Sequence, residues 1–348
     1  MTLSTTATAD HIYATGLRNQ WHAVVPSHFV APGAMRRVTA LGEQWLLFRR
    51  SDGVLSMLAD RCPHRGAPLS LGRHLGDRVA CWYHGVEVES DGTVSSVPGL
   101  PGCNLEGKKL VASLPVREAA GAILAYLGDE QHPEPVELTL PEPLDDPDVE
   151  PILCYAEWDV PWRYAMENLL DPMHGAFLHH ESHTMYDCET GRGYFFEKTD
   201  QRGVNFDWVE LCRTGIDWVD LSIPYPPSAG PGGAFGIVGM ACPVDAERTG
   251  VFFWRYRRVQ DWQRDTWRFL YKTLIEERHW EVLEQDRVMH GGHARGRRPA
   301  REPLSARPGR GTAQAPVAGT GGAAGRGRRL GRLSPPARLS RGALRPRR

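Results

Sequence analysis

The sequence predicts an α+β protein in which a small antiparallel β domain is followed by a larger domain that combines an antiparallel sheet with helices. Short apolar runs between turn signals fill residues 45–97, a proline- and acid-rich stretch occupies residues 128–151, and a long helical pattern spans residues 262–289. A chain of 348 residues is long enough to form two domains of ordinary size.

The first domain is predicted from short strand-like runs with turn residues between them. The runs WLLF and VLSML flank Ser51-Asp52-Gly53, and Gly-Asp and Asp-Gly pairs at residues 76–77 and 91–92 mark further turns. Glycine and aspartate favour tight turns because they tolerate backbone conformations that most residues avoid. This spacing indicates a small antiparallel sheet.

The boundary between the domains is expected in residues 128–151, GDEQHPEPVELTLPEPLDDPDVEP. Repeated proline and acidic residues interrupt any periodic pattern there and favour extended backbone. We therefore expect a first domain at residues 1–140, a second at residues 150–292 and a basic tail at residues 293–348.

The second domain is predicted to mix helices with strands. A helical segment is expected over residues 162–180, a strand at VFFWRY, and a long helix over residues 262–289. Trp267, Leu270 and Leu274 follow one another at three- and four-residue steps, which predicts that they share one face of the last helix.

The net charge of -1 conceals an acidic body. Residues 295–348 hold 15 of the 41 basic residues and only one of the 42 acidic residues, which leaves 26 basic and 41 acidic residues and a charge of -15. Nucleic-acid binding depends on clustered lysine and arginine, so we expect no nucleic-acid partner.

The sequence contains neither a secretion signal nor a membrane span that we recognise. The N-terminus has no charged start followed by an apolar run, and no apolar segment approaches the length that crosses a bilayer. The seven cysteines are an odd number spread along the chain, unlike the dense disulfide framework of a small secreted domain. We expect a cytoplasmic protein whose thiolates bind metal.

Two short motifs form the first candidate metal site, C-P-H at residues 62–64 and C-W-Y-H at residues 81–84, with sixteen residues between them. A cluster in which one iron takes two thiolates and the other takes two neutral imidazoles needs this ligand set, which Cys62, His64, Cys81 and His84 supply. Structural zinc is the alternative, although zinc motifs generally pair cysteine with cysteine and histidine with histidine.

The order CxH and then CxxH closely resembles the Rieske motif. The resemblance implies a 2Fe-2S cluster held by these four residues in a small antiparallel β Rieske domain. Rieske proteins of the respiratory cytochrome complexes have two further cysteines in these loops, joined as a disulfide. Ala67 and Tyr83 occupy those positions here, which resembles the oxygenase branch instead.

Asp171, His174 and His179 form the second candidate site, in the order DxxHxxxxH. Two imidazoles and one carboxylate on one face of Fe(II) leave the opposite positions open, so that dioxygen binds beside the substrate. An amphipathic helix whose histidines face water is the alternative interpretation, because a motif this short is only a hypothesis.

This second motif resembles the mononuclear iron motif of Rieske oxygenases. The resemblance implies that His174 and His179 bind a mononuclear Fe(II) and that the carboxylate ligand comes from far downstream. Asp286 is the best match, and Glu281 and Glu284 on the same helix are alternatives.

The same resemblance assigns catalytic roles to Asp171 and Asn168. Asp171 looks like the family's bridging aspartate, which accepts a hydrogen bond from an iron-binding histidine and links it to a cluster histidine of the next subunit. Asn168 is expected close to the open face of the iron. Such an electron path implies a ring of three identical subunits.

Over residues 10–292 the chain resembles the alpha (large terminal oxygenase) subunit of Rieske non-haem iron aromatic ring-hydroxylating oxygenases. The resemblance implies an enzyme that uses O2, and electrons from a separate NAD(P)H-dependent reductase with or without a ferredoxin, to hydroxylate, dihydroxylate or demethylate an aromatic substrate. The glycines of AGPGG at residues 229–233 lack the strand-turn-helix context of a dinucleotide site. A Rieske electron-transfer protein without oxygenase activity and an inactive truncated remnant are the alternatives.

The tail from residue 293 is dominated by Arg, Gly, Pro and Ala, and no core can be built from it. Such composition is typical of GC-rich DNA translated in the wrong register, and residues 304–313 can be encoded so that a one-base shift reads as Tyr-Gln-His-Asp-Leu-Gly-Ala-Val-Arg. A genuine disordered basic arm is the alternative. We hypothesise a frameshift between residues 289 and 304, which sequencing a fresh isolate of the gene would test.

Overall fold

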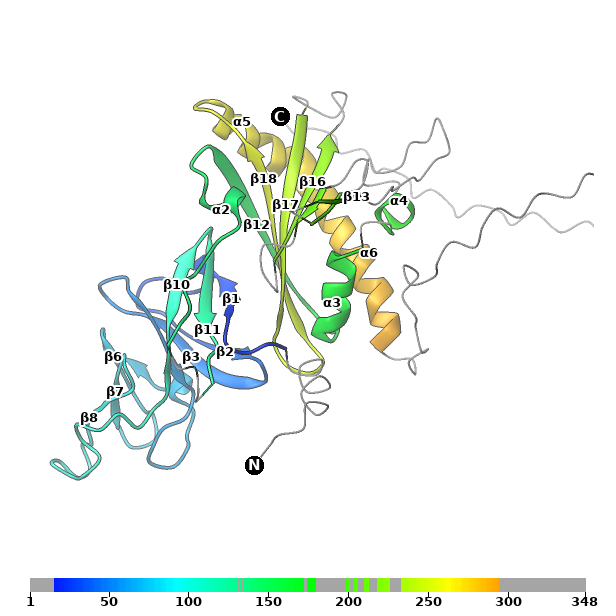
Figure 1. Ribbon diagram of the computed structural model, residues 1–348. Helices are drawn as coiled ribbons and strands as arrows, with labels where there is room; N and C mark the ends of the chain where they lie inside the picture. The colour runs from blue at the N-terminus through cyan, green and yellow to red at the C-terminus, as the bar shows by residue number, and fades with distance from the viewer. Residues whose placement is uncertain are drawn as a thin grey trace, which may run out of the picture. The chain divides into compact units, whose positions relative to one another are not determined.

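Figure 1 shows the computed structural model of the chain. It describes residues 16–129, 132, 134–171, 174–179, 198–200, 203–205, 210–212, 218–225 and 233–294. The predicted tail from residue 295 onward lies outside the described residues.

Three antiparallel sheets form the first part of the chain, in the orders β1-β11-β10, β2-β3-β4-β9 and β5-β6-β7-β8. Their strands are β1 (Trp21–Pro26), β2 (Met35–Ala40), β3 (Glu43–Arg49), β4 (Leu55–Ala59), β5 (Arg73–His74), β6 (Arg78–Ala80), β7 (Glu87–Glu89), β8 (Val94–Ser96), β9 (Ser113–Leu114), β10 (Val116–Ala119) and β11 (Ala122–Tyr126). Two short 3-10 turns accompany them, η1 (Ser27–Phe29) and η2 (Leu69–Leu71). The predicted small antiparallel domain is confirmed.

The run WLLF becomes β3, and its side chains are buried on both faces of the strand. Trp45 and Leu47 enter one core cluster, whereas Leu46 and Phe48 enter a second that also contains Cys62 and Cys81. Because successive side chains of a strand point to opposite faces, four consecutive apolar residues can join two cores. The second of these cores supports both cysteine-containing loops.

The second part of the chain is built on a seven-stranded antiparallel sheet in the order β12-β18-β17-β16-β15-β14-β13. The strands are β12 (Val149–Trp158), β13 (Lys198–Asp200), β14 (Gly203–Asn205), β15 (Glu210–Cys212), β16 (Trp218–Tyr225), β17 (Gly233–Pro243) and β18 (Thr249–Arg258). The helices are α2 (Glu142–Asp145), α3 (Trp162–Leu169), α4 (Gly175–Leu178), α5 (Gln263–Leu270) and α6 (Glu276–Ala294), with a π-helical turn, η5 (Tyr271–Ile275), between the last two. The predicted strand VFFWRY lies in β18, and the α+β fold class is confirmed.

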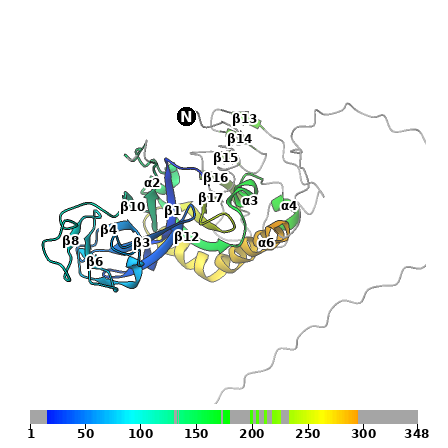
Figure 2. The same ribbon diagram turned by 90° about the horizontal axis from the view of Figure 1, so that it is seen from below.

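The central strands of this sheet are covered on both faces. Helices α3 and α6 lie on one side, and the three-stranded sheet that contains β1 and β11 lies on the other, as both views show (Figures 1 and 2). On the latter side Trp21 and Tyr126 pack with Trp254, whose Nε1 donates a 2.6 Å hydrogen bond to the carbonyl of Ala120. All described residues belong to one compact unit, so the predicted division between residues 140 and 150 stays a prediction.

Two details of the predicted helices are wrong. The helix expected over residues 162–180 is two short helices, α3 and α4, with Asp171 outside both. Proline at position 172 explains the interruption, because it disfavours helical backbone at the preceding residue and cannot donate a backbone hydrogen bond.

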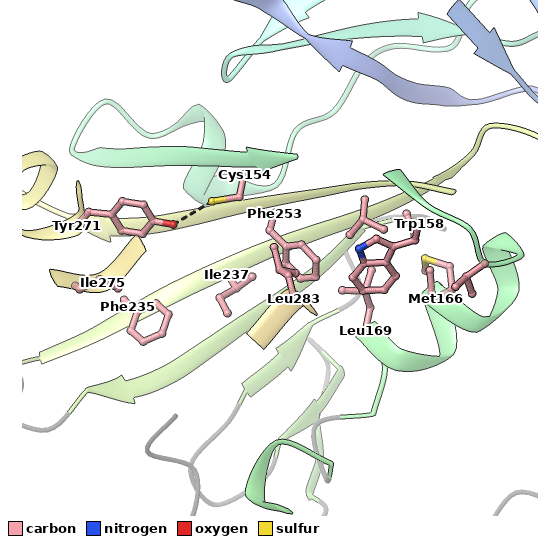
Figure 3. Close-up of a cluster of buried hydrophobic side chains, with 14 of the residues drawn as sticks. Cys154, Trp158, Met166, Leu169, Phe235, Ile237, Phe253, Tyr271, Ile275 and Leu283 are labelled. Atoms are coloured by element: carbon pink, nitrogen blue, oxygen red, sulfur yellow. Dashed lines mark hydrogen bonds between the residues drawn. The ribbon is translucent and has the colours of Figure 1, made fainter. Parts of the chain in front are cut away.

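The buried face of the long C-terminal helical segment also differs from the prediction. Trp267, Tyr271 and Ile275 are buried, whereas Leu274 is 60% exposed. The π-helical turn accommodates one extra residue per turn, so that positions four apart remain on the same face. Figure 3 shows Tyr271 and Ile275 at one end of the core cluster and Trp158, Met166 and Leu169 at the other.

Candidate metal centres

Three metal-binding side chains converge between α4 and α6. The ligand atoms of His174, His179 and Asp286 lie within 4.8 Å of one another. The Oδ1 atom of Asp286 is 3.4 Å from Nε2 of His174 and 3.1 Å from Nε2 of His179. The two histidines flank the single turn α4, and their rings are 5.1 Å apart at 78° to each other. A four-residue helix thus presents both imidazoles to the same point.

The electrostatics of this group favour a carboxylate beside two imidazoles. Burial acts to raise the pKa of Asp286, but the two neighbouring histidines outweigh it and lower the pKa to about 2. For His174, burial acts to lower the pKa, yet Asp286 and the charge and carbonyl of Asp171 raise it. In the metal-free chain, the carboxylate therefore stays ionised and attracts positive charge to this point.

The residues present fit a metal ion. Asp286 is 3% exposed, and its Oδ1 atom forms no hydrogen bond of acceptable geometry despite its nearness to the two ring nitrogens. A buried oxygen without a hydrogen bond is costly unless a ligand satisfies it. Two imidazoles and one carboxylate are the donor set of non-haem Fe(II) sites that keep open positions.

The two alternative carboxylates on α6 do not join this group among the described residues. Glu281 and Glu284 are both exposed, and Glu284 accepts a 2.7 Å hydrogen bond from Nε of Arg287. The three carboxylates lie on different faces of α6, and only Asp286 is on the buried face.

Gln285 is a further residue of the site that the sequence did not reveal. Its Oε1 atom lies 2.8 Å from Nδ1 of His179. An acceptor at this position holds the proton on Nδ1, so that the lone pair of Nε2 faces Asp286 and any bound metal. No spacing rule marks a glutamine next to an aspartate as such a partner.

Asn168 and His290 form a second unexpected contact beside the three ligands. Nε2 of His290 donates to Oδ1 of Asn168 at 2.8 Å, and Asn168 is 9% exposed. His290 lies one turn after Asp286 on α6, and Asn168 is near the end of α3. The four-residue step from Asp286 is the only sequence signal that could have indicated His290.

The four residues of the first candidate site lie on two loops of matching geometry. In each loop the cysteine carbonyl accepts a 2.9 Å hydrogen bond from the glycine four residues later, Gly66 or Gly85. Both glycines have φ of 71°, a left-handed conformation that suits glycine. The amides of Cys62 and Cys81 donate 2.8 Å bonds five residues ahead, to Ala67 and Val86 respectively.

Within these loops the cysteines are buried and the histidines are exposed. Cys62 is 3% and Cys81 is 1% exposed, while the rings of His64 and His84 lie at the surface with their centroids 4.7 Å apart. Burial and the nearby Cys81 raise the pKa of the Cys62 thiol. The thiol must lose its proton before it can bind a metal, so metal binding at this position would release a proton.

The arrangement does not match a single zinc ion. Among the described residues, only the group of His174, His179 and Asp286 brings three ligand atoms within 4.8 Å of one another. A tetrahedral zinc site would need all four atoms around one point, at bond lengths of about 2.0–2.3 Å. A separate thiol pair and imidazole pair fit a cluster of two irons.

Comparisons with known proteins agree with the first of these two sites. The Rieske [2Fe-2S] domain family matches residues 20–115. The chain is 38% identical over 168 residues to chlorophyllide a oxygenase of Chlamydomonas reinhardtii. The aligned region covers 47% of this chain and 25% of that protein. It is 35% identical over 170 residues to the terminal oxygenase component of carbazole 1,9a-dioxygenase of Metapseudomonas resinovorans, covering 48% and 44%. The chain thus spans less than half the length of these curated relatives.

The fold has a close counterpart among solved structures. The terminal oxygenase of carbazole 1,9a-dioxygenase from Novosphingobium sp. KA1 superposes with a TM-score of 0.64 at 23% identity, covering 83% of this chain and 88% of that one. None of the helices in the described residues is both long and apolar enough to cross a membrane.

Proposed function

Because residues 20–115 match the Rieske [2Fe-2S] domain family and the fold is similar to that of a carbazole 1,9a-dioxygenase terminal oxygenase, we propose that the chain is the alpha subunit, or terminal oxygenase component, of a Rieske non-haem iron system that oxidises an aromatic substrate with O2. The observation that carries the proposal is the presence in one chain of both a Rieske domain and the group formed by His174, His179 and Asp286. A protein that only carries electrons through its Rieske cluster would not need a second metal site formed by two histidines and an aspartate.

The donor atoms of each site determine which metal group we propose that it holds. Cys62, His64, Cys81 and His84 would hold the 2Fe-2S cluster, while His174, His179 and Asp286 would hold the mononuclear iron. When bound, the cluster supplies single electrons and the iron supplies the oxygen chemistry.

The remaining residues of the site orient the ligands. Gln285 accepts a hydrogen bond from Nδ1 of His179, and Asp171 raises the pKa of His174 through its charge and its carbonyl. His290 holds the side-chain oxygen of Asn168, which we propose lies at the open face of the iron. Asp171 itself is exposed, which suits the proposed bridge to a cluster histidine of a neighbouring subunit in a homotrimer.

The proposed electron donor is a separate NAD(P)H-dependent reductase acting through a ferredoxin. The exposed rings of His64 and His84 lie beside Trp82 and Tyr83, which are 76% and 59% exposed, so a surface is available next to the cluster. A complex of the oxygenase and ferredoxin of carbazole 1,9a-dioxygenase has been solved, which supports this choice of partner.

The proposed reaction is hydroxylation, dihydroxylation or demethylation of an aromatic compound in a catabolic pathway of the cytoplasm. The carbazole dioxygenase similarity supports an aromatic substrate. The chlorophyllide a oxygenase relative is a chloroplast protein, so a cytoplasmic location is proposed for this chain and does not follow from the similarity.

Metal analysis of the purified protein tests the proposal. We expect an iron-to-sulfide ratio of about 3:2 and a Rieske electron paramagnetic resonance signal after reduction. Asp286→Asn should lower the ratio to about 2:2 and keep the signal, whereas the matched control Glu284→Gln on the exposed side of α6 should change neither. A ratio of about 2:2 in the unaltered protein would indicate an electron carrier or an inactive remnant, and zinc without sulfide would overturn the proposal.

A further inference from the structure

A pocket that opens to solvent lies against the first of the two cysteine-containing loops. Its volume is about 500 Å³, and it is lined by residues 61–66 and 110–112 together with Ala59. Neither Cys81 nor His84 of the second loop lines it. The pocket is therefore separate from the space between the two loops in which the proposed cluster would lie.

The charged groups of this pocket are basic. Arg61 and Arg65 are both exposed, and neither side chain forms an ion pair or a hydrogen bond within the described part of the chain. Arg61 folds back over the loop, because a Cβ added at Gly66 would lie 3.2 Å from its Nε atom. Among the described residues no carboxylate lines the pocket, although residues 1–294 carry a net charge of -15. Two guanidinium groups thus concentrate positive charge beside the loop.

The remaining surface of the pocket is largely apolar. Leu110, which is 42% exposed, lines it together with Pro63 and Val111. Sites for small molecules generally have volumes of about 300–1,000 Å³ and combine apolar walls with a few polar groups. A guanidinium matches the oxygens of a phosphate with paired donors. The pocket therefore suits a molecule that joins a phosphate to a flat apolar ring.

The position of the pocket suggests a redox role for such a molecule. Cys62 and His64, two of the four proposed cluster ligands, line it directly. A molecule bound there would be separated from the cluster by no more than a ligand side chain. Because the proposed source of electrons is a separate protein, a carrier has to bring them to this part of the surface.

We propose that this pocket is an electron-entry site for free reduced flavin mononucleotide (FMN), with the phosphate bound by Arg61 and Arg65 and the ring against Leu110. This inference rests on the function proposed above and adds a route that needs no ferredoxin. The separate reductase would transfer a hydride from NAD(P)H to the flavin, which gives the anionic hydroquinone.

The electrons of the proposed step balance one at a time. The anionic hydroquinone gives one electron to the oxidised cluster and becomes the neutral flavin radical, without loss of a proton. One ferric ion of the cluster becomes ferrous, and histidine ligation favours this reduction by raising the potential of the cluster. The radical gives its remaining electron to a second oxidised cluster and releases a proton to water, which leaves oxidised flavin.

Equilibrium dialysis of the cluster-loaded, oxidised protein against oxidised FMN and against riboflavin tests the binding. Riboflavin has the same ring without the phosphate, so we expect FMN to bind at least about tenfold more tightly. AMP, which joins a phosphate to a different ring, should compete at least about tenfold more weakly than FMN.

Arginine variants test which groups give the preference for FMN. Arg61→Met and Arg65→Met should each bring the two flavins to within about twofold of each other in affinity, while Arg65→Lys should keep part of the preference. The matched control Arg73→Met alters an exposed arginine outside the pocket and should keep the full preference.

Anaerobic stopped-flow mixing with photoreduced FMN or riboflavin tests the electron transfer through the loss of cluster absorbance. Both reduced flavins have the same ring and therefore nearly the same driving force. We expect the cluster to be reduced at least about tenfold faster by FMN at low flavin concentration, and Arg65→Met should remove this difference.

Equal affinity of the unaltered protein for FMN and riboflavin, or for FMN and AMP, would overturn the inference without any variant. An undiminished preference in folded Arg61→Met and Arg65→Met proteins would do the same, as would reduction by FMN no faster than by riboflavin. Iron and sulfide are measured on every sample, so a missing preference in fully loaded protein counts against the pocket alone. Missing sulfide counts against the proposed function.

Discussion

Replacement of Gln285 by leucine should weaken iron binding while the fold is kept. Gln285 is partly buried, and its Oε1 atom lies 2.8 Å from Nδ1 of His179. Leucine has a similar volume but no acceptor, so the Nδ1 proton of a 4% exposed histidine would lose this partner. The side chain would then no longer fix which ring nitrogen carries the proton.

The expected magnitude follows from the loss of one buried hydrogen bond to a ligand. Such a loss costs about 1–3 kcal/mol when the donor stays buried. Removal of a partner that orients a metal ligand lowers metal affinity by about 10- to 100-fold, which is about 1.4–2.8 kcal/mol. The two ranges agree, so we expect the dissociation constant for Fe(II) to rise by about 10- to 100-fold in Gln285→Leu.

The assay is anaerobic competition for Fe(II) between a coloured chelator and protein that has its cluster but lacks mononuclear iron. Gln285→Glu keeps an acceptor and should bind iron at least as tightly as the unaltered protein, because a charged acceptor strengthens the hydrogen bond. Glu281→Gln changes an exposed carboxylate of the same helix and serves as the control. An iron affinity of Gln285→Leu within about twofold of the unaltered protein would refute the reasoning, as would an equal loss in Glu281→Gln.

Three further predictions follow from other contacts. Burial lowers the pKa of His22 from 6.5 to about 4, so the folded protein is stabilised by neutral His22 above pH 6.5 and loses this stability as the pH falls toward 4. His22→Gln should therefore remove about 2 kcal/mol of the loss in unfolding free energy between pH 7.5 and 5, measured by urea unfolding. The control His28→Gln changes an exposed histidine and should leave that loss unchanged. His290→Phe removes the donor to Asn168 and should slow substrate-dependent O2 consumption about fivefold with unchanged iron content; equal loss of iron would assign His290 a structural role instead. Trp254→Phe leaves the Ala120 carbonyl without its donor and should lower the free energy of unfolding by about 1–3 kcal/mol, whereas an unchanged value would mean that another donor replaces it.

Much of the first domain was predictable because its signals are local. Glycines at the turns have positive φ, as at Gly53 and Gly92, and the apolar run WLLF could only be a strand buried on both faces or part of a buried helix. The adjacent Ser51-Asp52-Gly53 turn decided between these, since Oδ1 of Asp52 accepts a hydrogen bond from the amide of Val54.

The helices of the second domain were less predictable because their course depends on packing. The pattern at Trp267, Leu270 and Leu274 satisfies an ideal α-helix, but the structure inserts a π-helical turn and buries Tyr271 and Ile275 instead. Periodicity assumes a constant number of residues per turn, so a local change in that number moves later residues to another face.

What the sequence determined by itself is the chemistry of the ligands and the geometry of short segments. Cysteine and histidine within one loop, or His174 and His179 at the two ends of one turn, are close because the chain between them is short. Their spacing therefore predicts which side chains act together, whatever the rest of the fold does.

Only the tertiary structure decided which distant residues complete these sites. The sequence offered three carboxylates on one helix, and the packing of α6 against α3 and the sheet turned Asp286 inward and left Glu281 and Glu284 in solvent. Gln285 and His290 acquired their partners in the same way, through contacts between elements far apart in the chain. Burial and the direction of a side chain are properties of packing, and no spacing rule along the sequence contains them.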